Sequence, residues 1–175
     1  MPHVIERAST GRAMCRACNT KIAAGAQRFG ERLPNPYGED GSEMTRWYHV
    51  ACAAFMRPES FLEALPAATE DIPDRELLER EARLGAEHRR LPRVHGLERA
   101  TSARATCRQC REPIAKDAWR VPLMFYEDGR FTPAGYIHVK CARAYLETVD
   151  VLGRLKHFSP AITEAEMAEV QKELE

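Results

Sequence analysis

The strongest constraint on this chain is a pattern of cysteine and histidine residues that occurs twice. Each copy has two cysteines separated by two residues, then a long gap, and then a histidine three residues before a third cysteine. The gap between the second cysteine and the histidine is 30 residues in the first copy and 27 in the second. The two sets are Cys15, Cys18, His49 and Cys52, and Cys107, Cys110, His138 and Cys141. Together they use all six cysteines of the 175-residue chain.

Three thiolates and one imidazole are the donors of a tetrahedral zinc site, so we predict two Zn²⁺ ions. Four protein ligands leave no open coordination position, which indicates structural rather than catalytic metal. Disulfides are the less favoured use of these cysteines, because the first residues lack the apolar core of a signal peptide and an intracellular chain is expected. A redox C-x-x-C pair is a further alternative, but neither pair follows an apolar strand.

The two copies also match at positions that cannot bind metal. A shift of 92 residues superposes Arg12 on Arg104 and Arg28 on Arg120, and beyond a shorter loop the shift becomes 89. Such matches predict two copies of one fold rather than two unrelated metal sites.

Charge is divided along the chain, although the formal net charge is 0. Residues 1–56 carry +2 and residues 96–147 carry +3, whereas residues 57–95 carry −2 and residues 148–175 carry −3. The metal-binding segments are therefore mildly cationic, which favours anion binding by them. The longest apolar run is seven residues, far below the ~20 that a membrane helix needs, so no membrane association is expected.

Each copy is expected to form an extended segment, a polar loop and a helix that carries the His-x2-Cys half of the site. The extended segments are residues 27–33 and 119–125, the loops 34–43 and 127–135, and the helices 50–56 and 139–149. Trp47 and Trp119 are expected in the cores of their copies.

Two further helices are expected outside the metal-binding segments. One spans residues 74–91, between Pro73 and Pro92, and its charged faces suggest a solvated spacer. A last helix is expected after Ser159. Their apolar sides would be formed by Leu77, Leu84 and Leu91 in the first and by Met167, Val170 and Leu174 in the second.

The predicted fold class is small α+β zinc-stabilised modules, arranged as two tandem fingers joined by a helical linker. The predicted domains are a first finger at residues 1–60, a linker at 61–96, a second finger at 97–150 and a helical tail at 151–175.

The first copy resembles the poly(ADP-ribose) polymerase-type zinc finger, which also occurs on a vertebrate DNA ligase. It reads Gly11-Arg12-Ala13-Met14-Cys15, then Cys18, Arg28, Arg46-Trp47-Tyr48-His49 and Cys52. The second copy keeps the ligands and both arginines but has Tyr136-Ile137-His138 where the family favours Trp-Tyr-His. The resemblance implies recognition of DNA strand breaks, and no part of the chain resembles the catalytic domains of these enzymes.

The resemblance also implies which residues meet DNA. Arg12 and Arg104 would contact phosphate, and Arg28 and Arg120 would reach a groove. An apolar side chain before the histidine would stack on the base pair exposed at a break. The stacking candidates are Tyr37 and Met44 in the first copy and Phe131 and Pro133 in the second; packing within the finger is the alternative for Tyr37, Met44 and Phe131.

The sequence thus predicts a non-enzymatic protein that binds DNA nicks, gaps or ends and has a possible repair enzyme as partner. No small-molecule substrate is expected. The protein would lie in the cytoplasm or nucleoid if bacterial and in the nucleus if eukaryotic. A zinc-scaffolded protein-interaction adaptor is the main alternative and would need an exposed apolar patch. An enzyme is disfavoured, because no paired carboxylates, Ser/His/Asp order or phosphate loop is present in the sequence.

Overall fold

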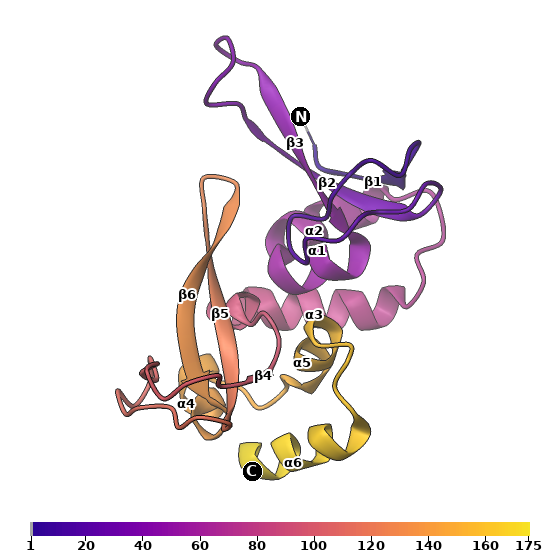
Figure 1. Cartoon of the computed structure of the whole chain (residues 1–175). Coiled ribbons are helices and arrows are strands. Elements are labelled where there is room, and N and C mark those ends of the chain that lie inside the picture. The colour runs from indigo at the N-terminus through magenta and orange to yellow at the C-terminus, as the bar shows by residue number, and fades with distance from the viewer. Residues whose placement is uncertain (1) are drawn as a thin grey trace. The chain divides into compact units, whose positions relative to one another are not determined.

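The computed structural model describes residues 2–175, which divide into two compact units. The first unit is built mainly of residues 2–87 and the second of residues 88–175. Each contains a three-stranded sheet followed by short helices (Figure 1). Among the described residues, no helix has the length and apolar character needed to cross a membrane.

The first unit is an antiparallel sheet, in the order β1-β2-β3, followed by three helices. The elements are β1 (Val4–Arg7), β2 (Gln27–Pro34), β3 (Glu43–His49), α1 (Val50–Met56), α2 (Pro58–Ala64), the 3-10 turn η1 (Leu65–Ala67) and α3 (Arg75–Glu87). Strands β2 and β3 form a long hairpin whose connecting loop projects away from α1 and α2 (Figure 1). Its register pairs Arg28 with His49, which brings the end of the hairpin to the metal ligands.

Aromatic side chains fill the core between the sheet and the helices of the first unit. Phe29, Tyr48 and Phe61 are fully buried, and the Phe29 ring lies 5.9 Å from Tyr48 and 6.2 Å from Phe61. Because neighbouring residues of a strand point to opposite faces, Tyr48 faces this core and Trp47 does not. Trp47 is half-exposed, so the expectation that it lies in the core is wrong.

The second unit repeats the three-stranded sheet and follows it with a 3-10 turn and three helices. Its elements are η2 (Leu91–Arg93), β4 (Glu98–Arg99), β5 (Trp119–Glu127), β6 (Arg130–His138), η3 (Val139–Cys141), α4 (Ala142–Leu146), α5 (Leu152–Phe158) and α6 (Glu164–Leu174). Strands β5 and β6 form a hairpin with a tight turn (Figure 1). Trp119 is buried, as expected.

The last two helices are part of the second unit. Ser159, which follows α5, accepts a hydrogen bond from the Leu97 amide at 2.7 Å and donates one to the Leu97 carbonyl at 3.0 Å. Glu169 on α6 accepts hydrogen bonds from Arg99 at 2.9 Å and from the Trp119 indole at 3.3 Å. Val170 and Leu174 of α6 are buried, as the sequence predicts, whereas Met167 is only partly buried.

Helix α3 differs from the expected solvated spacer. It packs against α1 and α2 of the first unit through Leu78, Glu81, Ala82 and Gly85, while Leu77 is 48% exposed. Of the predicted stripe, Leu77 is exposed and Leu84 partly buried, whereas Leu91 is fully buried in η2 (Leu91–Arg93), beyond the end of α3. The predicted linker at residues 61–96 also differs from the structure, since α2 and α3 belong to the first unit and η2 to the second.

Two other elements of the second unit differ from the sequence prediction. The loop expected at residues 127–135 is mostly strand β6, because Asp128 and Gly129 adopt positive φ values of 50° and 74° and close the hairpin in a short turn. The helix expected at residues 139–149 ends at Leu146, where Glu147 adopts a left-handed conformation with φ 61°.

Candidate metal centres and nucleic-acid interface

The first metal centre is built on a tight turn that follows Arg12. The Cys15 amide donates to the Thr20 carbonyl at 2.8 Å, and the Asn19 amide donates back to the Cys15 carbonyl at 2.9 Å. Asn19 closes this turn in the left-handed region, with φ 58°. The turn holds Cys15 and Cys18 opposite the junction of β3 and α1, where His49 ends the strand and Cys52 lies in the first turn of the helix.

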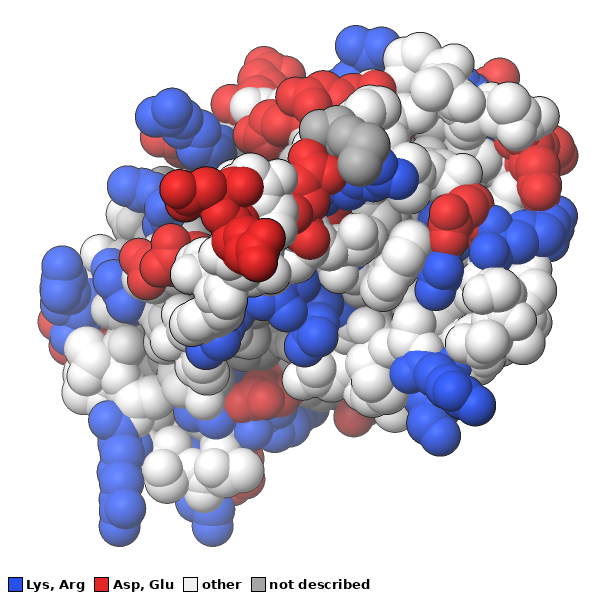
Figure 2. Space-filling view, turned by 90° about the horizontal axis from the view of Figure 1, so that it is seen from above, with Lys and Arg blue, Asp and Glu red and all other residues white. Residues whose placement is uncertain are grey.

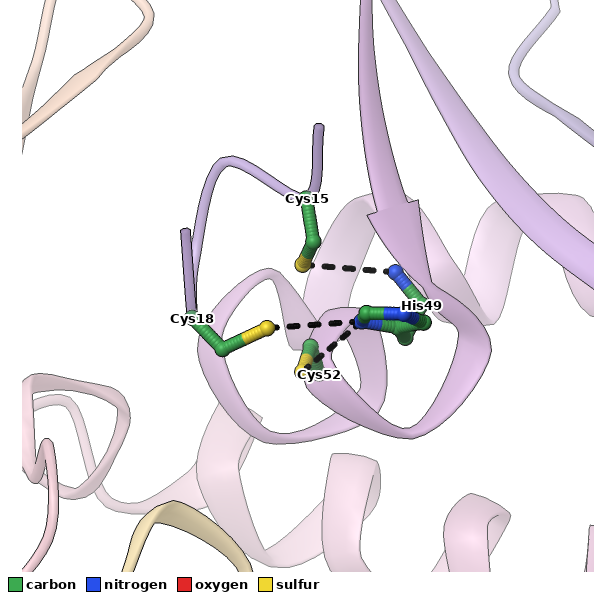
Figure 3. Close-up of side chains that lie close together, drawn as sticks. All are labelled: Cys15, Cys18, His49 and Cys52. Carbon is green, nitrogen blue, oxygen red and sulfur yellow. Dashed lines mark hydrogen bonds between the residues drawn. The ribbon is translucent and has the colours of Figure 1, made fainter. Parts of the chain in front are cut away.

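The four predicted ligands of the first centre converge on one point (Figure 3). Their ligand atoms all lie within 4.8 Å of one another. His49 Nδ1 is 3.4 Å from Cys18 Sγ and 3.9 Å from Cys52 Sγ. Tetrahedral coordination with ordinary Zn–S and Zn–N bonds places sulfur and nitrogen about 3.6 Å apart, so the cluster fits a tetrahedral ion without rearrangement.

The opposite ring nitrogen of His49 sets the orientation of the imidazole. Nε2 lies 3.3 Å from the Lys21 carbonyl oxygen, which can only accept a hydrogen bond. A proton on Nε2 leaves the Nδ1 lone pair directed at the cysteines, and such backing of a metal-binding histidine is usual. The His49 amide also donates to Cys15 Sγ at 3.4 Å, which stabilises a thiolate there.

Hydrogen bonds among the four ligands lower the pKa values of two of them and raise those of the other two. A hydrogen bond from the Cys52 thiol, together with bonds from His49, lowers the pKa of Cys15 to about 3. The same thiol lowers the pKa of Cys18 to about 5, and the pKa of Cys52 is raised in turn. Hydrogen bonding to Cys15 raises the pKa of His49 to about 9. Without metal, the cluster thus holds protons on His49 and Cys52 that a metal ion must displace.

The second centre reproduces this geometry in the second unit. Cys107, Cys110, His138 and Cys141 lie within the same 4.8 Å limit, and His138 Nδ1 is 3.4 Å from Cys110 Sγ and 3.9 Å from Cys141 Sγ. His138 Nε2 lies 3.2 Å from the Pro113 carbonyl oxygen. The centre is more open than the first, since Cys110 is exposed and Cys141 partly exposed, whereas Cys52 is buried.

The arginines that precede each centre are accessible to a ligand. Arg12 and Arg104 are both exposed and lie on the loops that lead to the first ligand cysteine. Within residues 2–175, neither forms an ion pair with an acidic side chain. In each copy a backbone hydrogen bond fixes this loop next to the metal turn. The Ile22 amide donates to the Ala13 carbonyl at 2.9 Å, and the Ile114 amide donates to the Ala105 carbonyl at 2.8 Å.

Arg28 and Arg120 are instead occupied within the protein. Arg28 forms a 2.6 Å ion pair with Glu6, and its guanidinium carbon lies 3.5 Å from the Trp47 ring centroid. Arg120 forms a 2.6 Å ion pair with Glu98 and is itself buried, with 6% exposure. Both arginines thus join the first strand of the sheet to the second, and the structure does not present them as free DNA-contacting cations.

The four stacking candidates differ in accessibility. Tyr37 is 82% exposed at the tip of the first hairpin loop, where its amide donates to Asn35 Oδ1 at 3.1 Å. Met44 is partly buried on β3, opposite Leu33. Phe131 is partly buried, with its ring 4.9 Å from that of Tyr126. Pro133 is exposed on β6.

One buried polar cluster of the first unit was not predicted. Glu31 is fully buried and accepts hydrogen bonds from Arg57 Nε and Ser60 Oγ, both at 2.8 Å, and from the Tyr48 hydroxyl at 3.2 Å. The signal that could have revealed it is a glutamate two residues after Phe29, hence on the same, buried face of β2, because such a carboxylate requires a buried cation or several donors.

Two Cys3His centres on repeated α+β units define a tandem zinc finger protein. Residues 6–86 match the family described as poly(ADP-ribose) polymerase and DNA-ligase Zn-finger region, and this part of the chain is a zinc finger of that family. The second unit repeats its donor set and its turn outside the matched residues.

Two curated relatives are similar to a large part of the chain. A poly [ADP-ribose] polymerase of Drosophila melanogaster is 26% identical over 141 residues, or 73% of this chain and 14% of the relative. The polynucleotide 3'-phosphatase ZDP of Arabidopsis thaliana is 25% identical over 167 residues, or 81% of this chain and 24% of the relative. The chain therefore spans only a quarter or less of the length of these relatives.

Proposed function

We propose that the protein binds discontinuities in duplex DNA, such as nicks, gaps or ends, through two Zn²⁺-stabilised fingers and without catalysing a reaction. The observation that carries this proposal is the repetition of one exposed, unneutralised arginine, Arg12 or Arg104, beside each metal turn. An arginine fork matches phosphate oxygens, and a metal-fixed backbone lowers the entropy lost when it binds. The relatives named above give the proposal its DNA-repair context.

The metal role that we propose is structural. Three cysteines and one histidine fill the four positions that Zn²⁺ takes in such sites, so no position is left for a reactive water. The fit of each cluster to a tetrahedron supports zinc as the ion.

Local arginines rather than bulk charge must account for the binding. The formal net charge is 0, and on the face drawn in Figure 2 basic and acidic side chains are interspersed. Binding should therefore be independent of base sequence and weakened by salt.

Tyr37 is the side chain best placed to read a break. It is a large, exposed ring at the tip of an ordered loop, and intact DNA offers it no open base-pair face. Stacking on such a face contributes about 1–3 kcal/mol, which corresponds to about 5- to 150-fold preference for broken DNA.

The proposal is tested by comparing a nicked duplex with the same duplex intact, both with hairpin-closed ends, by fluorescence anisotropy at fixed salt. The nicked duplex should bind at least 5-fold more tightly, and Tyr37→Ala should remove most of that preference. Leu77→Ala, which truncates an exposed side chain on α3, is the matched control and should keep it. Equal affinity of the unaltered protein for both duplexes would reject break recognition.

The phosphate role of the arginines has its own test. Arg12→Gln and Arg104→Gln should each weaken binding to nicked and intact DNA by the same factor and reduce the salt slope by about 1. Arg83→Gln is the control, because Arg83 is exposed but paired with Glu79. An unchanged slope in both variants would contradict the role.

A further inference from the structure

Three arginines of the second unit gather around two aromatic rings. Arg93 in η2 and Arg108 in the second C-x-x-C turn both lie over the ring of Phe125 on β5, with their guanidinium carbons 4.8 Å and 5.2 Å from its centroid. Arg90 lies over the ring of Tyr145 on α4, at 4.9 Å. We call these five residues the arginine cluster.

Hydrogen bonds to neutral oxygens orient the three guanidinium groups. Arg90 donates to the Tyr145 carbonyl and Arg93 to the Tyr145 hydroxyl, both at 3.2 Å. Arg108 donates to the Ala134 carbonyl at 2.7 Å. Each guanidinium has five N–H donors and uses one in these bonds, so most of its donors remain for a ligand.

No carboxylate compensates this charge within residues 2–175, where none of the three arginines forms an ion pair with an acidic side chain. Other arginines of the same unit behave differently. Arg99 lies over the Trp119 ring at 3.8 Å but also forms an ion pair with Glu169, and Arg120 is paired with Glu98. Three neighbouring cations without an acid repel one another, and a bound polyanion relieves that repulsion.

The cluster is specific to the second copy. Arg16 is the counterpart of Arg108, but the positions of Phe125 and Tyr145 are occupied in the first copy by Leu33 and Met56. Without the two rings, the first unit has no platform to orient several guanidinium groups in this way.

We infer that the arginine cluster is a phosphate-binding site that holds the DNA backbone of a bound duplex. Arg90 and Arg108 are exposed while Tyr145 is buried, so the rings support the guanidinium faces from inside the unit and leave N–H groups toward solvent. A spread of three cations suits successive phosphodiester groups of one strand better than a single phosphate. The inference rests on the proposed DNA binding and assigns it a contact beyond Arg104.

The test uses the full chain and the double variant Arg90→Gln/Arg108→Gln, which leaves Arg93 and both rings in place. Its matched control is Arg99→Gln, which removes an arginine from an aromatic ring where a glutamate already neutralises it. Affinity for the intact and nicked closed duplexes is measured over a range of NaCl concentrations. We expect the double variant to bind both duplexes about 10- to 60-fold more weakly at 0.1 M salt and to lower the salt slope by about 2. The control should stay within twofold of the unaltered protein.

The outcomes separate this inference from the proposed function. Loss of the slope difference between the double variant and the control overturns the phosphate role of the cluster, even where the nick preference persists. If the double variant lowers the salt slope but neither the unaltered protein nor any variant prefers the nicked duplex, the phosphate role of the cluster is supported and only break recognition is rejected.

A DNA-free measurement covers the case in which no duplex binds. Sodium tripolyphosphate should raise the Tm of the unaltered protein and of Arg99→Gln more than that of Arg90→Gln/Arg108→Gln. Equal Tm shifts in all three proteins overturn the inference.

Discussion

The two units keep the same surroundings for the metal and differ in how they fill their cores. Both have the backed histidine, and in both a strand glutamate pairs with an arginine that lies on an aromatic ring. The ring is Trp47 in the first unit and Tyr136 in the second, at 3.5 Å and 3.7 Å from the guanidinium carbon. Away from the metal, the buried Glu31 of the first unit has Leu123 as its counterpart, and Tyr48 has Ile137.

The contacts that the two units share lie around the metal centres. The turn, the histidine backing and the glutamate–arginine–ring contact occur twice with little change, so they form the frame common to both units. The core behind them can be polar or apolar, provided that each buried polar group has its partners.

The largest expected effect comes from breaking one metal centre at a time. Cys15→Ser and Cys107→Ser should each lower the bound zinc from two ions to one and unfold the unit concerned, because structural zinc contributes about 10–16 kcal/mol in small fingers. Native mass spectrometry gives the metal count, and hydrogen exchange resolved by peptide locates the loss of protection. Loss of protection in both units from either substitution would show that the units do not fold independently.

The affinity of the first centre for zinc should depend strongly on pH. The pKa of His49 is raised to about 9 and that of Cys52 is raised too, so below about pH 9 zinc displaces a proton from each. Affinity therefore falls as pH falls, by up to about tenfold per proton and pH unit, or about 100-fold from pH 8 to pH 7. Competition with a fluorescent chelator at the two pH values measures this. Burial raises the pKa of Cys141 to about 12, so the second centre must also release a proton. An affinity that does not change with pH would contradict the protonation pattern.

Replacing a core residue of the first unit by its counterpart from the second should destabilise the first unit, because one core is polar and the other apolar. Glu31→Leu installs the residue of the second copy and removes the carboxylate that accepts hydrogen bonds from Arg57 and the Tyr48 hydroxyl, at a cost of about 3–5 kcal/mol. Adding Tyr48→Ile removes the buried hydroxyl that bonded this carboxylate and should recover part of that loss. Urea unfolding of the zinc-loaded protein measures both.

The control for the core exchange is Glu79→Gln, which breaks an ion pair with the exposed Arg83 and should cost at most about 0.5 kcal/mol. Equal costs for Glu31→Leu and Glu79→Gln would show that the buried cluster is not a stabilising feature of the first unit.

The smallest expected effect concerns the openness of the two centres. Cys141 is partly exposed whereas Cys52 is buried, so Cys141 of the second centre should react a few-fold faster than Cys52 with iodoacetamide in the presence of EDTA. Peptide mass spectrometry at short times compares the two cysteines. Equal rates would mean that metal release, not exposure, limits the reaction at both centres.

The sequence was sufficient for the parts of the fold that the ligands and local periodicity determine. All eight ligands converge as predicted, and α1 has the predicted bounds of residues 50 and 56. The strand predicted at residues 27–33 is β2, which ends one residue later. These features depend on spacing and on neighbouring residues, which a single sequence displays directly.

Other features depend on contacts that spacing does not encode. Leu78 rather than Leu77 is buried because α1 and α2 select the face of α3, and nothing in the helix sequence alone distinguishes two adjacent leucines. The ion pair of Arg28 with Glu6 joins residues 22 apart across a strand pair, which the spacing of the sequence does not reveal. The arginine cluster likewise joins residues from 90 to 145, beyond the reach of a local pattern.

The two hydrogen bonds between Ser159 and the Leu97 backbone have a practical consequence for dividing the protein. The preceding residue, Gly96, has φ 115°, and a Cβ there would lie 2.6 Å from Ser159 Oγ, so this position tolerates no larger residue. Excising the second finger at residue 150 would cut away Ser159, which bonds the Leu97 backbone, together with Glu169, which bonds Arg99 and Trp119. A fragment that extends through Leu174 retains these contacts and is the smallest piece suited to studying that finger alone.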